Sequence, residues 1–164
     1  IKLVREKANW GNTKEGLYQG FAAYYSHNTH VAEIADISLK DGYPIIEKVT
    51  VAVDCGVLVN PTGAKNQVEG GVLDGIGHAM YADFSFNEGK PEHKNFNTYR
   101  LIRMQETPTV AVYFVENDKK PTGLGEPGLP PAGGAIANAI NAALGQRLYG
   151  QPFVKELKKS TVLG

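Results

Sequence analysis

The sequence predicts an α+β fold in which two helices rich in glycine and alanine pack on an antiparallel or mixed sheet. Strand-like alternation fills residues 31–54, a second strand pattern covers 109–116, and aliphatic residues recur every four positions in 64–81 and 130–145. Because 164 residues are enough for one domain with a hydrophobic core, we expect residues 1–164 to form a single domain.

A β-hairpin is the best-defined element in the first third of the chain. An aromatic-rich strand starts near Tyr18, and two runs of alternating polarity follow, separated by the turn signal Asp41-Gly42. Glu33 interrupts the apolar face of the first run. The residues expected on the buried face are Val31, Ala35, Ile37 and Leu39 in the first run and Ile45, Val49, Val51 and Val53 in the second.

A helix is predicted from about Ala64 to Tyr81, because apolar residues recur there every four positions. These residues are Val68, Val72, Ile76 and Met80. The same stretch carries glycine at positions 70, 71, 75 and 77. Each glycine costs about 1 kcal/mol relative to alanine in a helix interior, so we expect another backbone or a ligand to approach this helix closely.

The second strand pattern and the last helix follow further along the chain. Residues 109–116 are rich in β-branched and aromatic side chains and predict a buried strand. The last helix should begin at Pro130 or Pro131, where the missing amide proton does no harm, and should end at Gly145.

Three segments are less regular in sequence. Residues 84–93 predict a short hairpin rich in turn residues. Residues 95–108 fit either extended or irregular structure. The tail at 155–164 predicts a short exposed helix or a frayed end.

Composition argues against several classes of function. Seventeen basic and seventeen acidic residues leave no net charge, which argues against nucleic acid or an anionic membrane as a partner. The single cysteine, Cys55, rules out an internal disulfide and suggests a small buried side chain rather than a nucleophile. No stretch approaches the roughly 18 apolar residues of a membrane span. Because the chain starts at Ile1 rather than methionine, we expect a fragment of a longer protein.

Glu126 is the one acidic residue of the segment TGLGEPGLPPAGGAIANAI, residues 122–140. It precedes a predicted helix N-terminus, which favours a negative charge and can keep the carboxylate ionised against the effect of burial. Gly123 and Gly125 would let the backbone approach a bound group while Pro127 stiffens the loop, so a general base is one interpretation. The other is an acid that only caps the helix, and composition alone favours this second interpretation.

The predicted helix 64–81 offers another candidate group. Gln67 can donate and accept hydrogen bonds at the helix start and could hold a polar ligand there, although a solvated glutamine is the commoner outcome. A dinucleotide site is not expected, because G-x-G-x-x-G spacing is absent and no parallel strand–helix–strand unit is predicted around this helix. His27 and His30 are interpreted as structural or surface histidines, and no metal ligand is assigned.

Four motifs together identify a family resemblance. They are VAVDCGVLVNP at 51–61, QVEGGVLDGIGHAMY at 67–81, NFNTYRLIRMQETP at 95–108 and GLGEPGLPPAGGAIANAI at 123–140. In this order and spacing they resemble the C-terminal part of the molybdenum-binding large subunit of the molybdenum hydroxylases, the xanthine oxidase and aldehyde oxidase family. The branch that the sequence resembles most is the isoquinoline 1-oxidoreductase beta subunit.

The resemblance implies a molybdopterin-dependent hydroxylase that acts on N-heteroaromatic or aldehyde substrates and takes its oxygen from water. Glu126, the carboxylate of the G-x-G-E-P motif, would be the catalytic base at the molybdenum centre. The residues implied to bind the cofactor are Gln67, Gly70, Gly71, Gly123 and Gly125. Pterin sulfurs hold the metal in this family, and bacterial members generally use the cytosine dinucleotide form of molybdopterin, so no side-chain metal ligand is expected.

The resemblance also implies partners. In this family electrons pass to a separate iron–sulfur small subunit. The family's large subunits are several times longer than this chain, so the rest of the large subunit is expected as a second partner, and the fragment alone is expected to be inactive. The alternative is an isolated structural or interaction domain that binds no cofactor on its own.

Overall fold

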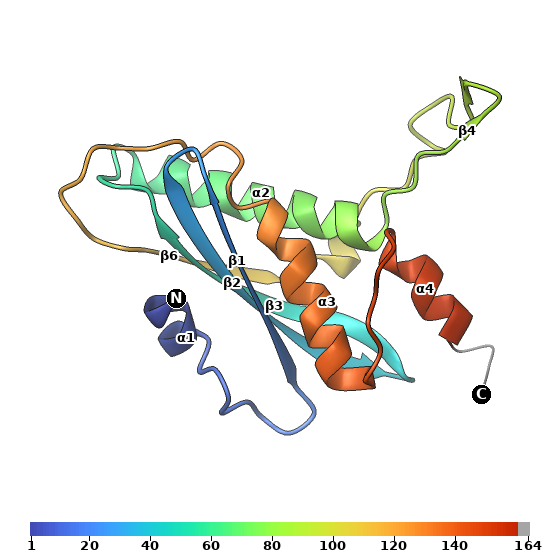
Figure 1. The fold of residues 1–164 in the computed structure, drawn as a ribbon, viewed down its shortest axis with the longest axis horizontal. Helices are drawn as coiled ribbons and strands as arrows, with labels where there is room; N and C mark the ends of the chain where they lie inside the picture. Colours follow the sequence, from blue (N-terminus) through green and yellow to red (C-terminus); the bar gives the residue numbers. More distant parts are fainter. Residues whose placement is uncertain (161–164) are drawn as a thin grey trace.

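The computed structural model describes residues 1–160 and shows a mixed sheet with helices on both faces (Figure 1). The strand order is β1-β2-β3-β6. Strands β1 (Tyr18–Ser26), β2 (Thr29–Lys40) and β3 (Tyr43–Asp54) form an antiparallel meander, and β6 (Thr109–Phe114) pairs with β3 in parallel. The predicted α+β class is confirmed, and of the two sheet types the mixed one is present.

Two-residue turns connect the first three strands. His27 and Asn28 have φ values of 53° and 60°, and Asp41 and Gly42 have φ values of 52° and 76°. Positive φ at both central residues gives a turn whose twist matches that of the flanking strands. The hairpin predicted at Asp41-Gly42 is therefore confirmed.

Two positions of the predicted hairpin face differ from the structure, because Leu39 is only half-buried and Ile45 is exposed. Ile45 is 39% exposed, and its neighbour Ile46 packs against the core instead. The pairing between β2 and β3 shifts by one residue between Asp36 and Ile37, so side chains on β3 before the shift point to the other face. The remaining apolar residues of β3, at positions 49, 51 and 53, are fully buried as predicted.

Helices α2 (Pro61–Met80) and α3 (Pro130–Leu144) pack on one face of the sheet and form the main core with it. α2 begins three residues earlier than predicted, because the Asn60 side chain accepts a hydrogen bond from the Gly63 amide at 3.0 Å and caps the helix. α3 has the predicted bounds and ends at Gly145, whose φ is 68°. All four apolar residues of the predicted α2 repeat are buried.

Strand β6 and helix α2 differ from expectation in two ways. β3, α2 and β6 form a parallel strand–helix–strand unit, so the expectation that no such unit surrounds the glycine-rich helix is wrong. β6 was expected to be buried, yet its residues are mostly half-buried because it lies at the edge of the sheet. The strand itself, predicted at 109–116, is confirmed.

The two ends of the chain add helices that the sequence pattern did not define well. α1 (Lys2–Lys7) was not predicted and covers the opposite face of the sheet, where Val4 packs with Ala32 and Ile34. α4 (Phe153–Ser160) was expected to be exposed or frayed, but Phe153 and Leu157 are buried in the main core. Residues 161–164 of the predicted tail lie outside the described part of the chain.

Part of the segment between α2 and β6, around β4, extends away from the sheet (Figure 1). The segment contains the short hairpin of β4 (Phe86–Asn87) and β5 (Lys90–Pro91), as predicted, and the 3₁₀ helix η1 (Met104–Glu106). Among the described residues, no helix has the length and apolar character needed to span a bilayer.

Candidate functional site

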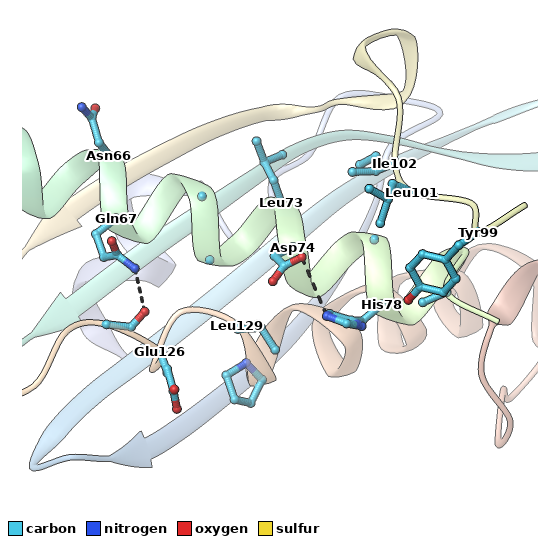
Figure 2. Close-up of a pocket in the computed structure, with 16 residues that line it drawn as sticks. Asn66, Gln67, Leu73, Asp74, His78, Tyr99, Leu101, Ile102, Glu126 and Leu129 are labelled. Carbon is cyan, nitrogen blue, oxygen red and sulfur yellow. Dashed lines mark hydrogen bonds and ion pairs between the residues drawn. The ribbon is translucent and has the colours of Figure 1, made fainter. Parts of the chain in front are cut away.

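A cleft of about 720 Å³ lies along α2, between this helix, residues 99–102 and the loop that leads into α3 (Figure 2). Its volume falls in the range of about 300–1,000 Å³ that small-molecule sites occupy. Five of the six residues that the sequence analysis assigns to catalysis or cofactor binding line it: Gln67, Gly70, Gly71, Gly125 and Glu126. The fold therefore brings two motifs that are far apart in the sequence to the same cleft.

Gln67 connects the two walls of the cleft. Its Nε2 donates a hydrogen bond of 2.7 Å to the carbonyl oxygen of Gly125, 58 positions away in the sequence (Figure 2). No hydrogen bond to the side-chain oxygen of Gln67, Oε1, is seen within residues 1–160, so this oxygen can still accept one from a ligand. The side chain thus fixes the loop in addition to facing the cleft.

Glu126 lies at the rim of the cleft. Its side chain is exposed and points away from α2 (Figure 2), so the expected burial of the carboxylate is not present in this chain. It does not cap α3 either, because the N-cap residue is Leu129 and no side-chain bond caps this end. The residues just behind it, Pro127 and Gly128, are buried and hold the loop against the domain.

The glycines around the cleft divide into two groups. A Cβ at Gly70 or Gly125 would meet no atom within 4 Å, so no described residue requires glycine there. A Cβ at Gly71 would make ordinary contact with Leu129 N at 3.6 Å. Gly123 lies on the far side of the loop, does not line the cleft, and would place a Cβ 2.7 Å from the Cβ of His27. The open space at Gly70 and Gly125 faces the cleft and is available to a ligand.

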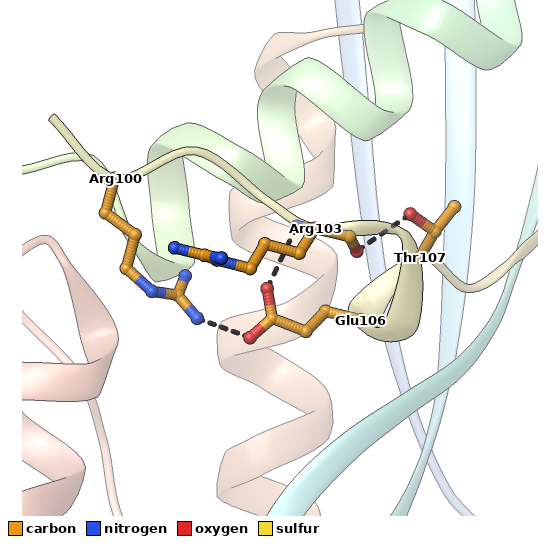
Figure 3. Close-up of polar contacts among 4 residues, drawn as sticks. All are labelled: Arg100, Arg103, Glu106 and Thr107. Carbon is orange, nitrogen blue, oxygen red and sulfur yellow. Dashed lines mark hydrogen bonds and ion pairs between the residues drawn. The ribbon is translucent and has the colours of Figure 1, made fainter. Parts of the chain in front are cut away.

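A short network holds the wall formed by residues 99–102. The Arg100 guanidinium stacks on the Tyr81 ring at 3.7 Å and forms an ion pair with Glu106 (Figure 3). The other carboxylate oxygen of Glu106 accepts a hydrogen bond of 3.0 Å from the Arg103 amide. Burial raises the pKa of Tyr81, Glu106 raises it further, and Arg100 opposes both effects. The Arg100 side chain and the Arg103 amide thus support this wall through Glu106.

Asp74 and His78 were missed as cleft residues by the sequence analysis. They line the cleft one turn apart on α2, with Asp74 Oδ1 and His78 Nε2 3.8 Å apart. The spacing of Gln67, Gly70 or Gly71, Asp74 and His78 places all of them on one helix face, and this periodicity could have identified them. No group of three or more His, Cys, Asp or Glu side chains suited to a metal ion occurs within residues 1–160.

One ionisable group is buried away from the cleft. Glu33 on β2 is fully buried, and neither of its carboxylate oxygens has a hydrogen-bond partner. Burial raises the pKa of Glu33 well above its usual range. Cys55 is buried as expected, and burial also raises the pKa of its thiol.

Comparison with known proteins places these features in a family. The family model described as "Molybdopterin cofactor-binding domain" matches residues 3–108, which include Gln67, Gly70 and Gly71 but not Glu126. The chain is 34% identical to the membrane-bound aldehyde dehydrogenase [pyrroloquinoline-quinone] of Gluconacetobacter polyoxogenes, over 93% of this chain and 21% of the relative. It is 30% identical to the isoquinoline 1-oxidoreductase subunit beta of Brevundimonas diminuta, over 98% of this chain and 22% of that relative.

Solved structures share the fold. Quinoline 2-oxidoreductase from Pseudomonas putida 86 matches with a TM-score of 0.69 at 19% identity, over 82% of this chain and 18% of that chain. Aldehyde oxidoreductase from Desulfovibrio gigas matches with a TM-score of 0.66 at 24% identity, over 79% of this chain and 15% of that chain. The chain spans about a fifth of the length of the two curated relatives.

Proposed function

Because this chain belongs to the molybdopterin cofactor-binding domain family of the molybdenum hydroxylases, we propose that it forms one wall of the cofactor and substrate site of such an enzyme. The observation that carries the proposal is that Gln67, the glycines of α2 and the loop of Glu126 meet at one cleft. The enzyme would hydroxylate N-heteroaromatic or aldehyde substrates.

The cleft fits a molybdenum–molybdopterin group in its donors and in its open space. The side-chain oxygen of Gln67, Oε1, could accept a hydrogen bond from the pterin, and Gly70, Gly71 and Gly125 would let the pterin approach the backbone. Gly123 would act indirectly, by letting the loop close on the β1–β2 turn. When bound, the group supplies two-electron redox chemistry and activates an oxygen that comes from water. The cytosine dinucleotide form is supported by the family resemblance alone.

We assign Glu126 the role of general base. An ionised carboxylate at the cleft rim can accept a proton from the attacking oxygen if it lies within about 2.6–3.2 Å of that oxygen. The Gln67–Gly125 bond and the buried Pro127 and Gly128 fix the position of the loop that carries it. In this chain the carboxylate is exposed, so the role requires further protein to enclose the site.

The proposed partners are the rest of the large subunit and an iron–sulfur small subunit that receives the electrons. The chain spans about a fifth of its curated relatives, which leaves room for the segments that would complete the site. One relative is named as a subunit beta and another as a large subunit, and both names fit an assembly of several chains.

The test is the Glu126→Gln variant of the assembled holoenzyme. Because glutamine keeps the shape of the side chain but cannot accept the proton, we expect turnover to fall by at least about 100-fold while molybdenum content stays unchanged. Turnover is measured with benzaldehyde and with isoquinoline, using a phenazine dye as electron acceptor, and molybdenum is measured by mass spectrometry.

Asp74→Asn is the matched control, since Asp74 is the other carboxylate that lines the cleft. We expect it to keep most of the turnover. Ordinary turnover in Glu126→Gln would reject the assigned base, whereas a loss of molybdenum in that variant would point to a structural role of the loop.

A second candidate function is a non-catalytic interaction domain, and the exposed Glu126 carboxylate is the observation that favours it. Metal analysis separates the two. Molybdenum and pterin that co-purify with this domain in its native assembly support the enzyme. A metal-free, colourless native assembly supports the interaction domain.

A further inference from the structure

The loop that carries Glu126 is attached at its start to the turn between β1 and β2. The Gly123 amide donates to the His27 carbonyl oxygen at 3.1 Å, and the Thr122 amide donates to the Cys55 carbonyl oxygen at 2.9 Å. The missing side chain of Gly123 allows this contact, because a Cβ there would stand 2.7 Å from the Cβ of His27. The start of the loop is therefore anchored both to the β1–β2 turn and to Cys55, just after β3.

Thr29, the first residue of β2, provides the side-chain contact that attaches the start of the loop. It is fully buried, and its hydroxyl donates to the Gly123 carbonyl oxygen at 2.6 Å. The same hydroxyl oxygen lies 2.7 Å from the Thr122 hydroxyl. Since a threonine hydroxyl has one hydrogen, which goes to Gly123, Thr122 must be the donor in the second bond. One buried hydroxyl thus binds two consecutive residues of the loop.

The two bonds of Thr29 lie three and four positions before Glu126, and the Gln67–Gly125 bond lies one position before it. On the other side, the Leu129 amide donates to the Glu126 carbonyl oxygen at 3.0 Å, where α3 begins. The backbone around Glu126 is therefore held from the sheet, from α2 and from α3. Of these attachments, the one from Thr29 comes from a side chain that does not line the cleft.

We propose that Thr29 is a positioning residue, which sets the place of the Glu126 carboxylate by binding Thr122 and Gly123. The inference rests on the proposed function of Glu126. A buried hydroxyl is suited to this task, because the packing around the fully buried Thr29 fixes where its hydroxyl lies, and removing the hydroxyl takes away the partner of both the Gly123 carbonyl and the Thr122 hydroxyl. A displacement of about 1 Å in a catalytic group can reduce the rate about 100-fold.

The test compares Thr29→Val with Thr29→Ser in the assembled holoenzyme. Valine keeps the branched shape but loses the hydroxyl, and serine keeps the hydroxyl but loses the methyl group. We expect Thr29→Val to lower kcat roughly 10- to 100-fold with KM changed less than about 3-fold and molybdenum content unchanged. We expect Thr29→Ser to restore kcat to within about 3-fold of the wild-type value. The substrates are benzaldehyde and isoquinoline.

Hydrogen–deuterium exchange gives a readout that does not depend on turnover. In Thr29→Val, amides of residues 122–129 should exchange faster while those of β2 and β3 keep their protection. Thr122→Val removes the hydroxyl bond from the loop side and should give a smaller change in the same direction, so it tests the proposal even if Thr29→Val fails to fold.

The outcomes separate this inference from the proposed function. Wild-type exchange in Thr29→Val, or equal loss of kcat in the valine and serine variants, overturns the positioning role. Faster exchange with unchanged kcat also overturns it. Ordinary turnover in Glu126→Gln overturns the function of Glu126 instead, whatever the Thr29 variants show.

Discussion

Gly75 of α2 lies directly against Leu129, so closely that a Cβ at position 75 would stand 2.4 Å from the Leu129 carbonyl oxygen. Ala132 on α3 would be 3.0 Å away. This glycine is therefore the point at which α2 and the start of α3 cross in close contact. It explains one of the costly glycines in the helix and places the Glu126 loop beside Gln67.

Gly75→Ala should destabilise the protein. Alanine would add about 1 kcal/mol of helix propensity, but the Leu129 backbone would have to move, and such overpacking costs about 1–3 kcal/mol. We expect a net loss in the free energy of unfolding, measured by denaturant titration. Gly70→Ala is the control on the same helix. A Cβ there meets nothing within 4 Å, so this variant should be at least as stable as the wild type. Greater stability in Gly75→Ala would contradict the packing described.

Much of this fold follows from local patterns in the sequence. The alternation in β2 and β3, the Asp41-Gly42 turn and the repeats of α2 and α3 are each set by neighbouring residues, and the structure has them all. The phase of Ile45 was missed because the bulge arises from pairing with β2 rather than from the β3 sequence. α1 has only six residues and becomes stable through the sheet face that Val4 contacts, so its own sequence carries little signal.

The candidate site was less predictable from residues alone. From composition alone, Glu126 was interpreted as a helix cap and Gln67 as a solvated side chain. Only the family resemblance assigned both residues to the same site. Their meeting at one cleft depends on the Gly75–Leu129 contact, which joins segments more than 50 positions apart. The exposure of Glu126 could not be predicted either, because it depends on what packs over the loop and not on the loop sequence.

Gln67→Leu should loosen the Glu126 loop without unfolding the domain. Leucine has a similar size but cannot donate to the Gly125 carbonyl oxygen, and Gly125 is exposed, so water can replace the lost bond at a cost of about 0.5–1.5 kcal/mol. Hydrogen–deuterium exchange of residues 124–129 should therefore become faster. Asn66→Leu, at a neighbouring residue that also lines the cleft, should leave this exchange unchanged. Equal exchange in the two variants would show that the Gln67 bond does not hold the loop.

Arg100→Lys should weaken the wall of the cleft formed by residues 99–102. Lysine keeps the charge but loses the planar group that stacks on Tyr81 and pairs with Glu106, and we expect a loss of about 0.5–1 kcal/mol in the free energy of unfolding. Arg103→Lys is the control, because the amide of residue 103 and not its side chain bonds to Glu106. A loss of stability in Arg103→Lys as large as in Arg100→Lys would show that charge alone supports the wall.

Glu33→Gln should change how stability depends on pH. Because burial raises the pKa of Glu33 in the folded protein, the unfolded chain releases the proton first, near pH 4.3. Above that pH the wild type loses stability by up to about 1.4 kcal/mol per pH unit until the folded pKa is reached, and the loss is then complete. Glutamine cannot ionise, so the variant should match the wild type most closely near pH 4 and exceed it increasingly toward neutral pH.

Denaturant titrations between pH 4 and pH 8 measure this difference. Glu15→Gln, which removes an exposed carboxylate, provides the control and should follow the wild-type curve closely. The sign of the stability difference between Glu33→Gln and the wild type at neutral pH distinguishes two explanations. A cation bound beside Glu33 would stabilise the ionised carboxylate and lower its pKa, and Glu33→Gln would then be less stable than the wild type at neutral pH. If the variant becomes more stable relative to the wild type as the pH rises, the core must hold Glu33 in its neutral form. This is the expected result, because neither oxygen of Glu33 has a hydrogen-bond partner there.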